Sequence, residues 1–164
     1  MVTDYFRRLT DLLGIKFLIA VAAVYGANQG LSESLSSFAG KFLLLDPPPE
    51  GLGLTAAEMT AFTGIAMTPW IFKALYGLLS DRVPICGYKR APYIVIAGIC
   101  GCIANAGLAG VHSPWAYSAF AFLSALGTAL PDVMVDAVVA ERSRANPALA
   151  ADLQVLRSSL TINR

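Results

Sequence analysis

Charged residues are scarce in this sequence. Only 14% of its 164 residues are Asp, Glu, Lys or Arg, against about a quarter in an ordinary soluble domain. Hydrophobic residues make up 56% of the chain, and the mean hydropathy is +0.61. The ionisable residues inside the long apolar runs are Glu33, Lys73, Asp132 and Asp136. This composition argues against a soluble domain and indicates a membrane protein.

The residue types that bind metals or carry out catalysis are also few. His112 is the single histidine, and Cys86, Cys100 and Cys102 do not have the spacing of metal ligands. The sequence contains no glycine-rich phosphate loop, no Cys/His cluster and no nucleophile elbow. With a net charge of +1 and no basic stripe, it does not favour nucleic-acid binding either. We therefore expect no metal, no cofactor and no enzymatic activity.

The apolar runs predict an all-α membrane protein with four transmembrane helices and the start of a fifth. The helices are expected at about 15–38, 56–79, 93–111 and 115–140, after an amphipathic segment at 1–14. A cleaved signal peptide is the less favoured alternative for the N-terminus. Residues 141–164 are expected to form a cytoplasmic loop and the truncated start of a fifth helix.

Helix boundaries are indicated by caps and prolines. Thr55 and Glu58 have the spacing of a capping box before the second helix, and the stretch 46–51 contains three consecutive prolines that exclude a helix. Pro69 is expected to kink the second helix, and Pro131 is expected to interrupt the fourth.

The distribution of Lys and Arg predicts the orientation in the membrane. Ten of these residues lie in the N-terminal segment, the loop after the second helix and the C-terminal tail, against one in the loop after the first helix. By the positive-inside rule, the N-terminus, the 80–92 loop and the tail face the cytoplasm or an equivalent side such as the stroma.

The charges inside the membrane are the strongest candidates for function, because burying them is costly and they should face the bundle interior. Asp132 and Asp136 lie one turn apart on the fourth helix, and Lys73 on the second helix falls at a depth between them. One hypothesis is that Lys73 binds an anionic group of a solute, while Asp132 or Asp136 binds a polar group or a proton. The alternative is a Lys73–Asp136 ion pair that fixes the two helices. The two interpretations are compatible.

Two further sets of residues have a structural and a functional interpretation. Gln29 and Glu33 on the first helix either line a solute path or, as we favour, form interhelical hydrogen bonds. Trp70 and Tyr76 flank Lys73 and either stack on a planar ligand or, as we favour, pack in the core.

The loop after the second helix is rich in charge. Asp81 ends that helix, where the helix dipole disfavours a carboxylate, and Arg82, Lys89 and Arg90 are its expected partners. One interpretation is that the positive charges of the loop only keep it on the cytoplasmic side. The other is that the loop acts as a charge clamp between the halves of a moving transporter.

The same loop resembles a known family. Gly77-x-x-x-Asp81-Arg82 followed by Gly87-Tyr88-Lys89-Arg90 is similar to the signature of the major facilitator superfamily. The longer pattern, from Pro69-Trp70-x-x-Lys73 to Pro92-Tyr93, resembles the folate–biopterin transporter family, as do Gln29-Gly30, Asp132-Val-x-Val-Asp136 and Leu153-Gln154. Ala74 and Ala91 depart from the family pattern, and so does the sequence after Gln154.

The resemblance implies a multi-pass carrier of folates or related pteridines that works by alternating access, with proton coupling as an option. The family's functional residues map onto Lys73, Asp81, Arg90, Asp132 and Asp136. Family members have about twelve helices in two halves, so we expect this chain to be a fragment or a short form of the N-terminal half. Its expected partners are a small solute such as folate or pterin, a proton, the lipid bilayer and the remainder of the carrier or a larger complex.

Two alternatives stay open: a transporter of another organic solute on the same scaffold, and a non-transporting subunit of a membrane complex. If the chain is part of a carrier, replacement of Lys73 by Met should abolish uptake but not folding. If the chain is a packing subunit, the same replacement should abolish assembly. The sequence does not distinguish the plasma membrane from the plastid envelope.

Overall fold

The structure is a computed structural model that describes residues 10, 14–26, 30 and 34–145. Among these residues all regular elements are helices, apart from one isolated β-bridge between Ile85 and Tyr88. The predicted all-helical fold is therefore confirmed for the described ranges. The chain divides into two compact units, one of residues 1–33 with 135–164 and one of residues 34–134.

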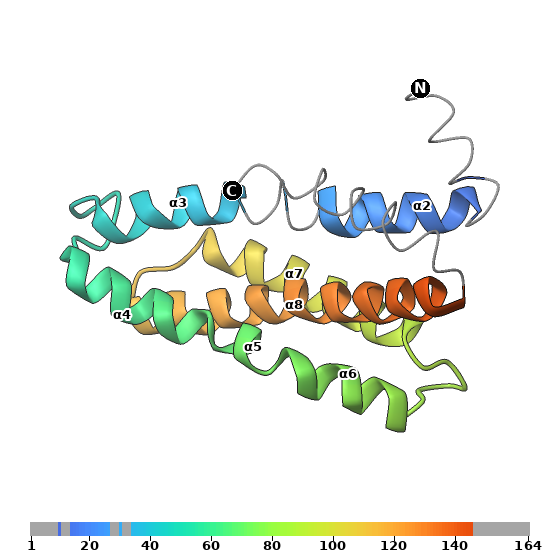
Figure 1. Cartoon of the computed structure of the whole chain (residues 1–164). Helices are drawn as coiled ribbons and strands as arrows, with labels where there is room; N and C mark the ends of the chain where they lie inside the picture. The colour runs from blue at the N-terminus through green and yellow to red at the C-terminus, as the bar shows by residue number, and fades with distance from the viewer. Residues whose placement is uncertain (1–9, 11–13, 27–29, 31–33, 146–164) are drawn as a thin grey trace. The chain divides into compact units, whose positions relative to one another are not determined.

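The first unit contains α2 (Ile15–Ala22) and the C-terminal part of α8 (Pro114–Ala145) (Figure 1). After α2 the backbone continues as a π-helical turn over residues 23–26. Val21, Tyr25 and Val135 form the buried cluster of this unit. Most of the predicted amphipathic segment 1–14, the candidate residues Gln29 and Glu33, and residues 146–164 lie outside the described part of the chain.

The second unit begins with α3 (Ser34–Leu45), which extends beyond the boundary predicted near Phe38. The predicted end of the helix near Phe38 was wrong, because residues 42–45 are apolar again and Leu44 is fully buried. The helix ends where Asp46 precedes Pro47, since a residue before proline is disfavoured in helical geometry.

A loop over residues 46–55 joins α3 to α4 (Ala56–Ala66). Its backbone folds onto the end of α3, with the Leu52 and Leu54 amides each 2.8 Å from the carbonyl oxygens of Leu43 and Leu44. The predicted capping box is confirmed: Thr55 Oγ accepts from the Glu58 amide, and the Glu58 carboxylate accepts from the Thr55 amide at 2.9 Å. Such a cap satisfies amides that have no partner within the helix.

The predicted second helix is divided into three pieces. After α4, a break at Met67 leads into α5 (Thr68–Ile71), and a second break at Phe72 leads into α6 (Lys73–Arg82). Pro69 lacks the amide that would bind the Ile65 carbonyl in a regular helix. The Thr68 hydroxyl donates to that carbonyl instead, at 2.7 Å.

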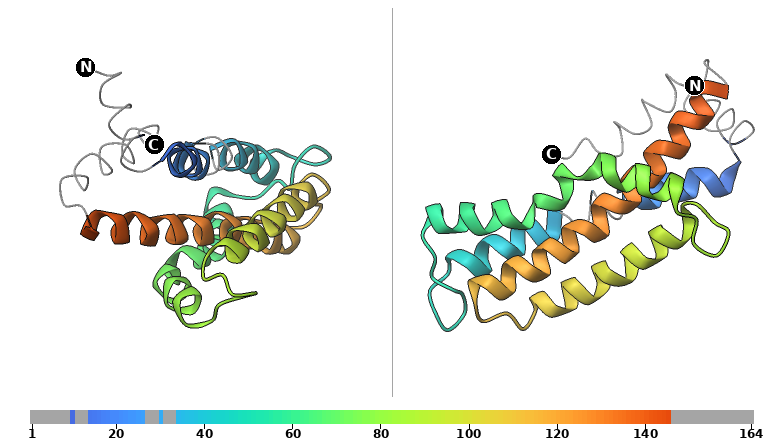
Figure 2. Two further views of the ribbon diagram at one scale, coloured as in Figure 1. Left: turned by 90° about the vertical axis from the view of Figure 1, so that its right-hand side faces the viewer. Right: turned by 90° about the horizontal axis from the view of Figure 1, so that it is seen from below.

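The two longest helices of the described residues lie side by side (Figure 2). α7 (Ala91–Leu108) and α8 approach so closely that a Cβ on Gly127 would lie 2.8 Å from Gly101 Cα. The prediction that Pro131 interrupts the fourth helix is wrong, because α8 continues through it. The surroundings explain this, since Pro131 is buried, and neighbouring helices allow a proline inside a membrane helix.

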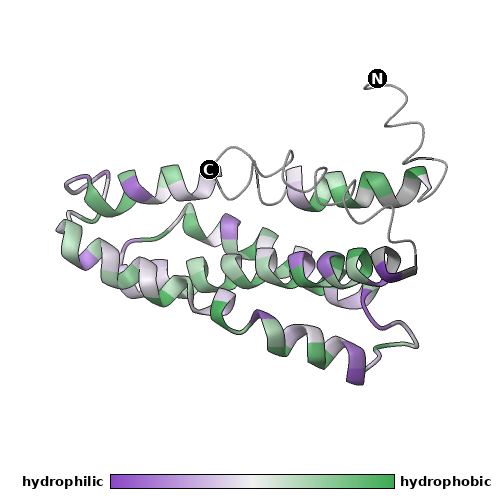
Figure 3. Cartoon of the chain, viewed as in Figure 1, coloured by the Kyte–Doolittle hydropathy of each residue, from purple (hydrophilic) through white to green (hydrophobic). Residues whose placement is uncertain are grey.

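Ala91–Leu108 and Pro114–Glu141 are each long and apolar enough to cross a membrane. Apolar residues predominate along both helices, whereas the end of α6 is polar and the loop that follows it has an apolar and a polar part (Figure 3). The count of four spanning helices stays a prediction.

Candidate functional site

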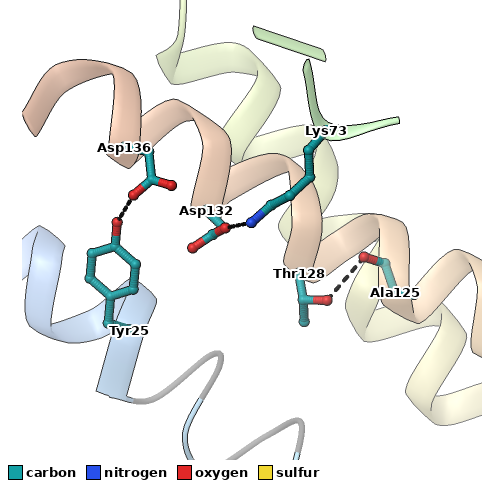
Figure 4. Close-up of polar contacts among 6 residues, drawn as sticks. All are labelled: Tyr25, Lys73, Ala125, Thr128, Asp132 and Asp136. Atoms are coloured by element: carbon teal, nitrogen blue, oxygen red, sulfur yellow. Dashed lines mark hydrogen bonds and ion pairs between the residues drawn. The ribbon is translucent and has the colours of Figure 1, made fainter. Parts of the chain in front are cut away.

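Lys73 is the first residue of α6 and follows directly on the break at Phe72. Its ammonium group forms an ion pair with Asp132 on α8 (Figure 4). The Lys73 side chain is 30% exposed, whereas that of Asp132 is only 1% exposed. The carboxylate is therefore closed off, whereas the lysine side chain is partly exposed.

The same ammonium group lies 4.5 Å from the centre of the Trp70 ring. This distance is within the range of a cation–π interaction. Trp70 belongs to the short helix α5, so the break at Phe72 sets the directions of both side chains. The cation is thus shared between a buried carboxylate and a half-buried aromatic face.

The close packing of α6 on α8 selects the partner of Lys73. A Cβ on Gly77, one turn after Lys73, would lie 3.2 Å from a methyl carbon of Val133. Because α6 approaches α8 at the level of Val133, its lysine meets Asp132. The predicted Lys73–Asp136 ion pair is wrong, and the pair forms with Asp132 instead.

Asp136 accepts a hydrogen bond from the hydroxyl of Tyr25, within the other unit of the chain (Figure 4). Sequence reasoning missed Tyr25. The available signal was a tyrosine inside an apolar run, because a buried phenol needs a hydrogen-bond partner. The sequence did not indicate which carboxylate would supply it.

A second missed residue, Asn105 on α7, connects three helices of the 34–134 unit. Its amide oxygen accepts from Ser36 on α3 at 3.0 Å, and its amide nitrogen donates to Ser124 on α8 at 3.2 Å. The same nitrogen also donates to the Gly101 carbonyl at 2.8 Å. These bonds mark a structural junction rather than a solute site.

The loop after α6 is a tight hairpin. Ile85 and Tyr88 exchange two backbone hydrogen bonds of 3.0 Å around Cys86 and Gly87, which have φ of 52° and 81°. Positive φ at both central positions is the geometry of a type I′ turn. At the base of the loop, the Tyr93 hydroxyl donates to the Val83 carbonyl at 2.8 Å.

Arg90 is the partner that Asp81 was expected to need, at 3.2 Å. Arg82 and Lys89 are exposed and form no ion pair with a described residue. Asp81 lies eight residues after Lys73 along α6, about 12 Å of helix. The charged loop and the Lys73 site are therefore separate groups of residues.

Within the described ranges, no group of three His, Cys, Asp or Glu side chains is arranged to hold a metal ion. The Lys73 ammonium group beside the Trp70 ring instead suits an organic anion. An accessible cation attracts a carboxylate, and the adjacent aromatic face suits a planar ring.

A family model described as the BT1 family matches residues 29–161. The chain is 33% identical over 156 residues to "Probable folate-biopterin transporter 2" of Arabidopsis thaliana, with coverage of 94% of this chain and 30% of the relative. It is 36% identical over 131 residues to the "Folate-biopterin transporter" of Synechocystis sp., covering 77% of this chain and 25% of the relative. The chain thus spans less than a third of the length of these relatives. No solved structure matches it.

Proposed function

The chain belongs to the BT1 family, and from this premise we propose that it forms the solute-binding part of a membrane transporter for folate- or pterin-type organic anions. The matching relatives are named as transporters, not as enzymes. The observation that carries the proposal is the partly exposed Lys73 side chain, whose ammonium group contacts the Trp70 ring and the buried Asp132 carboxylate.

The proposed binding step is an exchange of partners at Lys73. A carboxylate of the solute approaches the exposed side of the ammonium group, and the planar ring of the solute stacks on Trp70. The arriving carboxylate competes with Asp132 for the same cation. Since Asp132 is only 1% exposed, loss of its ammonium partner would leave a buried charge without compensation, at a large cost in free energy.

The competition between the two carboxylates for Lys73 ends if Asp132 becomes neutral by binding a proton. If Asp132 takes up a proton as the solute binds, the site keeps one cation and one anion throughout the cycle. In this proposed scheme, one proton is taken up with each bound carboxylate, so that transport is coupled to a proton. Release of the solute on the other side lets Asp132 lose the proton and return to Lys73.

The breaks between α4, α5 and α6 also support a solute site at Lys73. Solute sites of secondary transporters often lie where membrane helices are discontinuous, and Lys73 follows such a break. We propose that alternating access moves the α5–α6 segment, with the Asp81–Arg90 ion pair as the charge clamp at the end of α6.

We further propose four spans, with the N-terminus and the hairpin of residues 83–90 on the cytoplasmic side. The support is the ten-to-one distribution of Lys and Arg across the loops. Cys86 is exposed in the hairpin, so a membrane-impermeant maleimide should label it in inverted vesicles and not in sealed right-side-out vesicles. Labelling from the opposite side would refute the orientation.

The transport proposal is tested with the paired variant Lys73→Met/Asp132→Asn. A single change at Lys73 confounds folding with function, because it leaves a buried carboxylate without its ammonium partner. The paired variant removes both charges together and should keep the fold. We expect it to reach the membrane at the parent level and to lose uptake of radiolabelled folate.

The matched control is Lys41→Met, which removes an exposed lysine of α3 and should retain uptake. A non-transporting subunit predicts a different result. In that case the paired variant would assemble normally, and neither the parent nor the variant would take up folate above protein-free membranes.

A further inference from the structure

Tyr25 is the most deeply buried aromatic side chain of the 1–33 and 135–164 unit among its described residues, at 1% exposure. Its ring packs with Val21 and Val135, and Val24 and Val139 border the cluster. A phenol in such surroundings needs a hydrogen-bond acceptor. The acceptor is the carboxyl group of Asp136 on α8.

The backbone at Tyr25 is unusual as well. Residues 23–26 form a π-helical turn directly after α2. Such turns are rare, they insert one residue into a helix, and they occur frequently at functional sites. Tyr25 lies within this turn and packs with Val21, four residues before it, so the turn carries the tyrosine in the buried cluster.

Asp132 and Asp136 lie one turn apart on α8 and have different partners. Asp132 is bound by a cation, the Lys73 ammonium group, and Asp136 is bound by a neutral hydroxyl. A hydroxyl donor fixes the direction of the carboxyl oxygen that accepts from it. Asp136 is therefore oriented by a group that belongs to a different helix from Lys73.

We propose that Tyr25 is a positioning residue, whose hydroxyl fixes the orientation of the Asp136 carboxyl group and thereby prepares it to bind solute. The proposal rests on the proposed function in one respect, transport of an organic anion by this chain, and it adds Asp136 to the residues that bind the solute. The positioning itself is a property of the hydrogen bond and is measured without transport.

The first test is infrared spectroscopy of the protein in lipid, with ¹³C-labelled aspartate carboxyl groups. The Asp136 band is identified as the one that Asp136→Asn removes. Tyr25→Phe deletes only the hydroxyl and keeps the ring in its apolar cluster, so the protein should fold. We expect the Asp136 band to shift because it loses a donor.

The matched control is Tyr117→Phe, which removes the hydroxyl of another buried tyrosine of the chain and should leave the Asp136 band in place. Fluorotyrosine at position 25 provides a second variant, because the more acidic phenol is a stronger donor. It should shift the band in the direction opposite to Tyr25→Phe. An unchanged Asp136 band in both Tyr25 variants would overturn the proposal.

The second test is the kinetics of folate uptake. Tyr25→Phe should raise KM about three- to ten-fold, the range expected for the loss of one hydrogen bond, with Vmax changed less. In the Asp136→Ala background, which leaves the hydroxyl no side-chain acceptor at this position, the same change should have no further effect. An unchanged KM, or an equal rise of KM in both backgrounds, would contradict a role through Asp136. Absence of uptake by the parent protein would count against the proposed function, and the infrared result would still decide the positioning.

Discussion

The ion pair between Lys73 and Asp132 leads to a prediction about stability that follows from unequal burial. Replacing Lys73 by Met should lower the free energy of unfolding by about 3 kcal/mol, because Asp132 stays buried at 1% exposure after losing its ammonium partner. We take the lower end of the range for broken buried pairs because the Lys73 side chain is 30% exposed, and solvent weakens the pair.

The reverse change should be milder. In Asp132→Asn, the ammonium group keeps its contact with the Trp70 ring and its access to solvent, so we expect a loss of about 1 kcal/mol. In the paired variant Lys73→Met/Asp132→Asn, no charge is left at the site. The paired variant should therefore lose about 2 kcal/mol less free energy of unfolding than the sum of the two single losses.

The assay is reversible unfolding in mixed detergent micelles, followed by circular dichroism, for the parent, the two single variants and the paired variant. Lys41→Met is the control for loss of an exposed lysine and should change stability by less than about 0.5 kcal/mol. Strictly additive losses in the paired variant, or a Lys73→Met loss no larger than that of the control, would refute the reasoning.

Three further predictions concern residues of α7 and α8 and their packing. Gly127→Ala should destabilise the protein by about 1–3 kcal/mol, since the added Cβ would lie 2.8 Å from Gly101 Cα and 2.9 Å from the Ala97 carbonyl oxygen. Gly98→Ala, on α7 with nothing within 4 Å of the added Cβ, should instead stabilise it by up to about 1 kcal/mol. Asn105→Leu should cost about 1 kcal/mol, because it removes the hydrogen bonds to α3 and α8.

The same unfolding assay measures these variants. Gly98→Ala serves as the control for Gly127→Ala, because the two changes add the same methyl group to a helical glycine. Equal effects of the two glycine variants would show that the close contact at Gly101 is absent. A stabilising Asn105→Leu would show that the hydrogen bonds of Asn105 contribute less than an apolar side chain at this junction.

Several features of the fold were predictable from local sequence. The capping box at Thr55 and Glu58 depends only on residues three apart, and it was predicted correctly. The helical class followed from long apolar runs and is confirmed for the described ranges. The partner of Asp81 was among the three basic residues that the loop places nearby, and it is Arg90.

The errors arose where packing between helices decides the outcome. Pro131 was expected to interrupt α8, but a buried proline is accommodated within it. Pro69 was expected to kink one continuous helix, but the helix is broken twice, at Met67 and at Phe72. A proline pattern indicates that a helix is weakened, and the tertiary contacts determine whether and where it breaks.

The candidate site was likewise predictable in part, as far as it depends on local sequence and not on packing between helices. Lys73 and the two aspartates were identifiable as candidates because charge is costly in an apolar run. Depth along the helices could not choose between Asp132 and Asp136, since the choice depends on how α6 packs on α8 through Gly77 and Val133. Tyr25 was not identified because its hydrogen bond to Asp136 joins residues 111 positions apart in the sequence.

The most direct test of the central claim is uptake of radiolabelled folate by membranes that contain equal amounts of the parent protein or of Lys73→Met/Asp132→Asn. The account predicts uptake by the parent that increases with an inward proton gradient, and none by the folded paired variant above protein-free membranes. Undiminished uptake by the paired variant would contradict the account, because the solute anion would then bind without the Lys73 cation and the proton would act elsewhere than at Asp132.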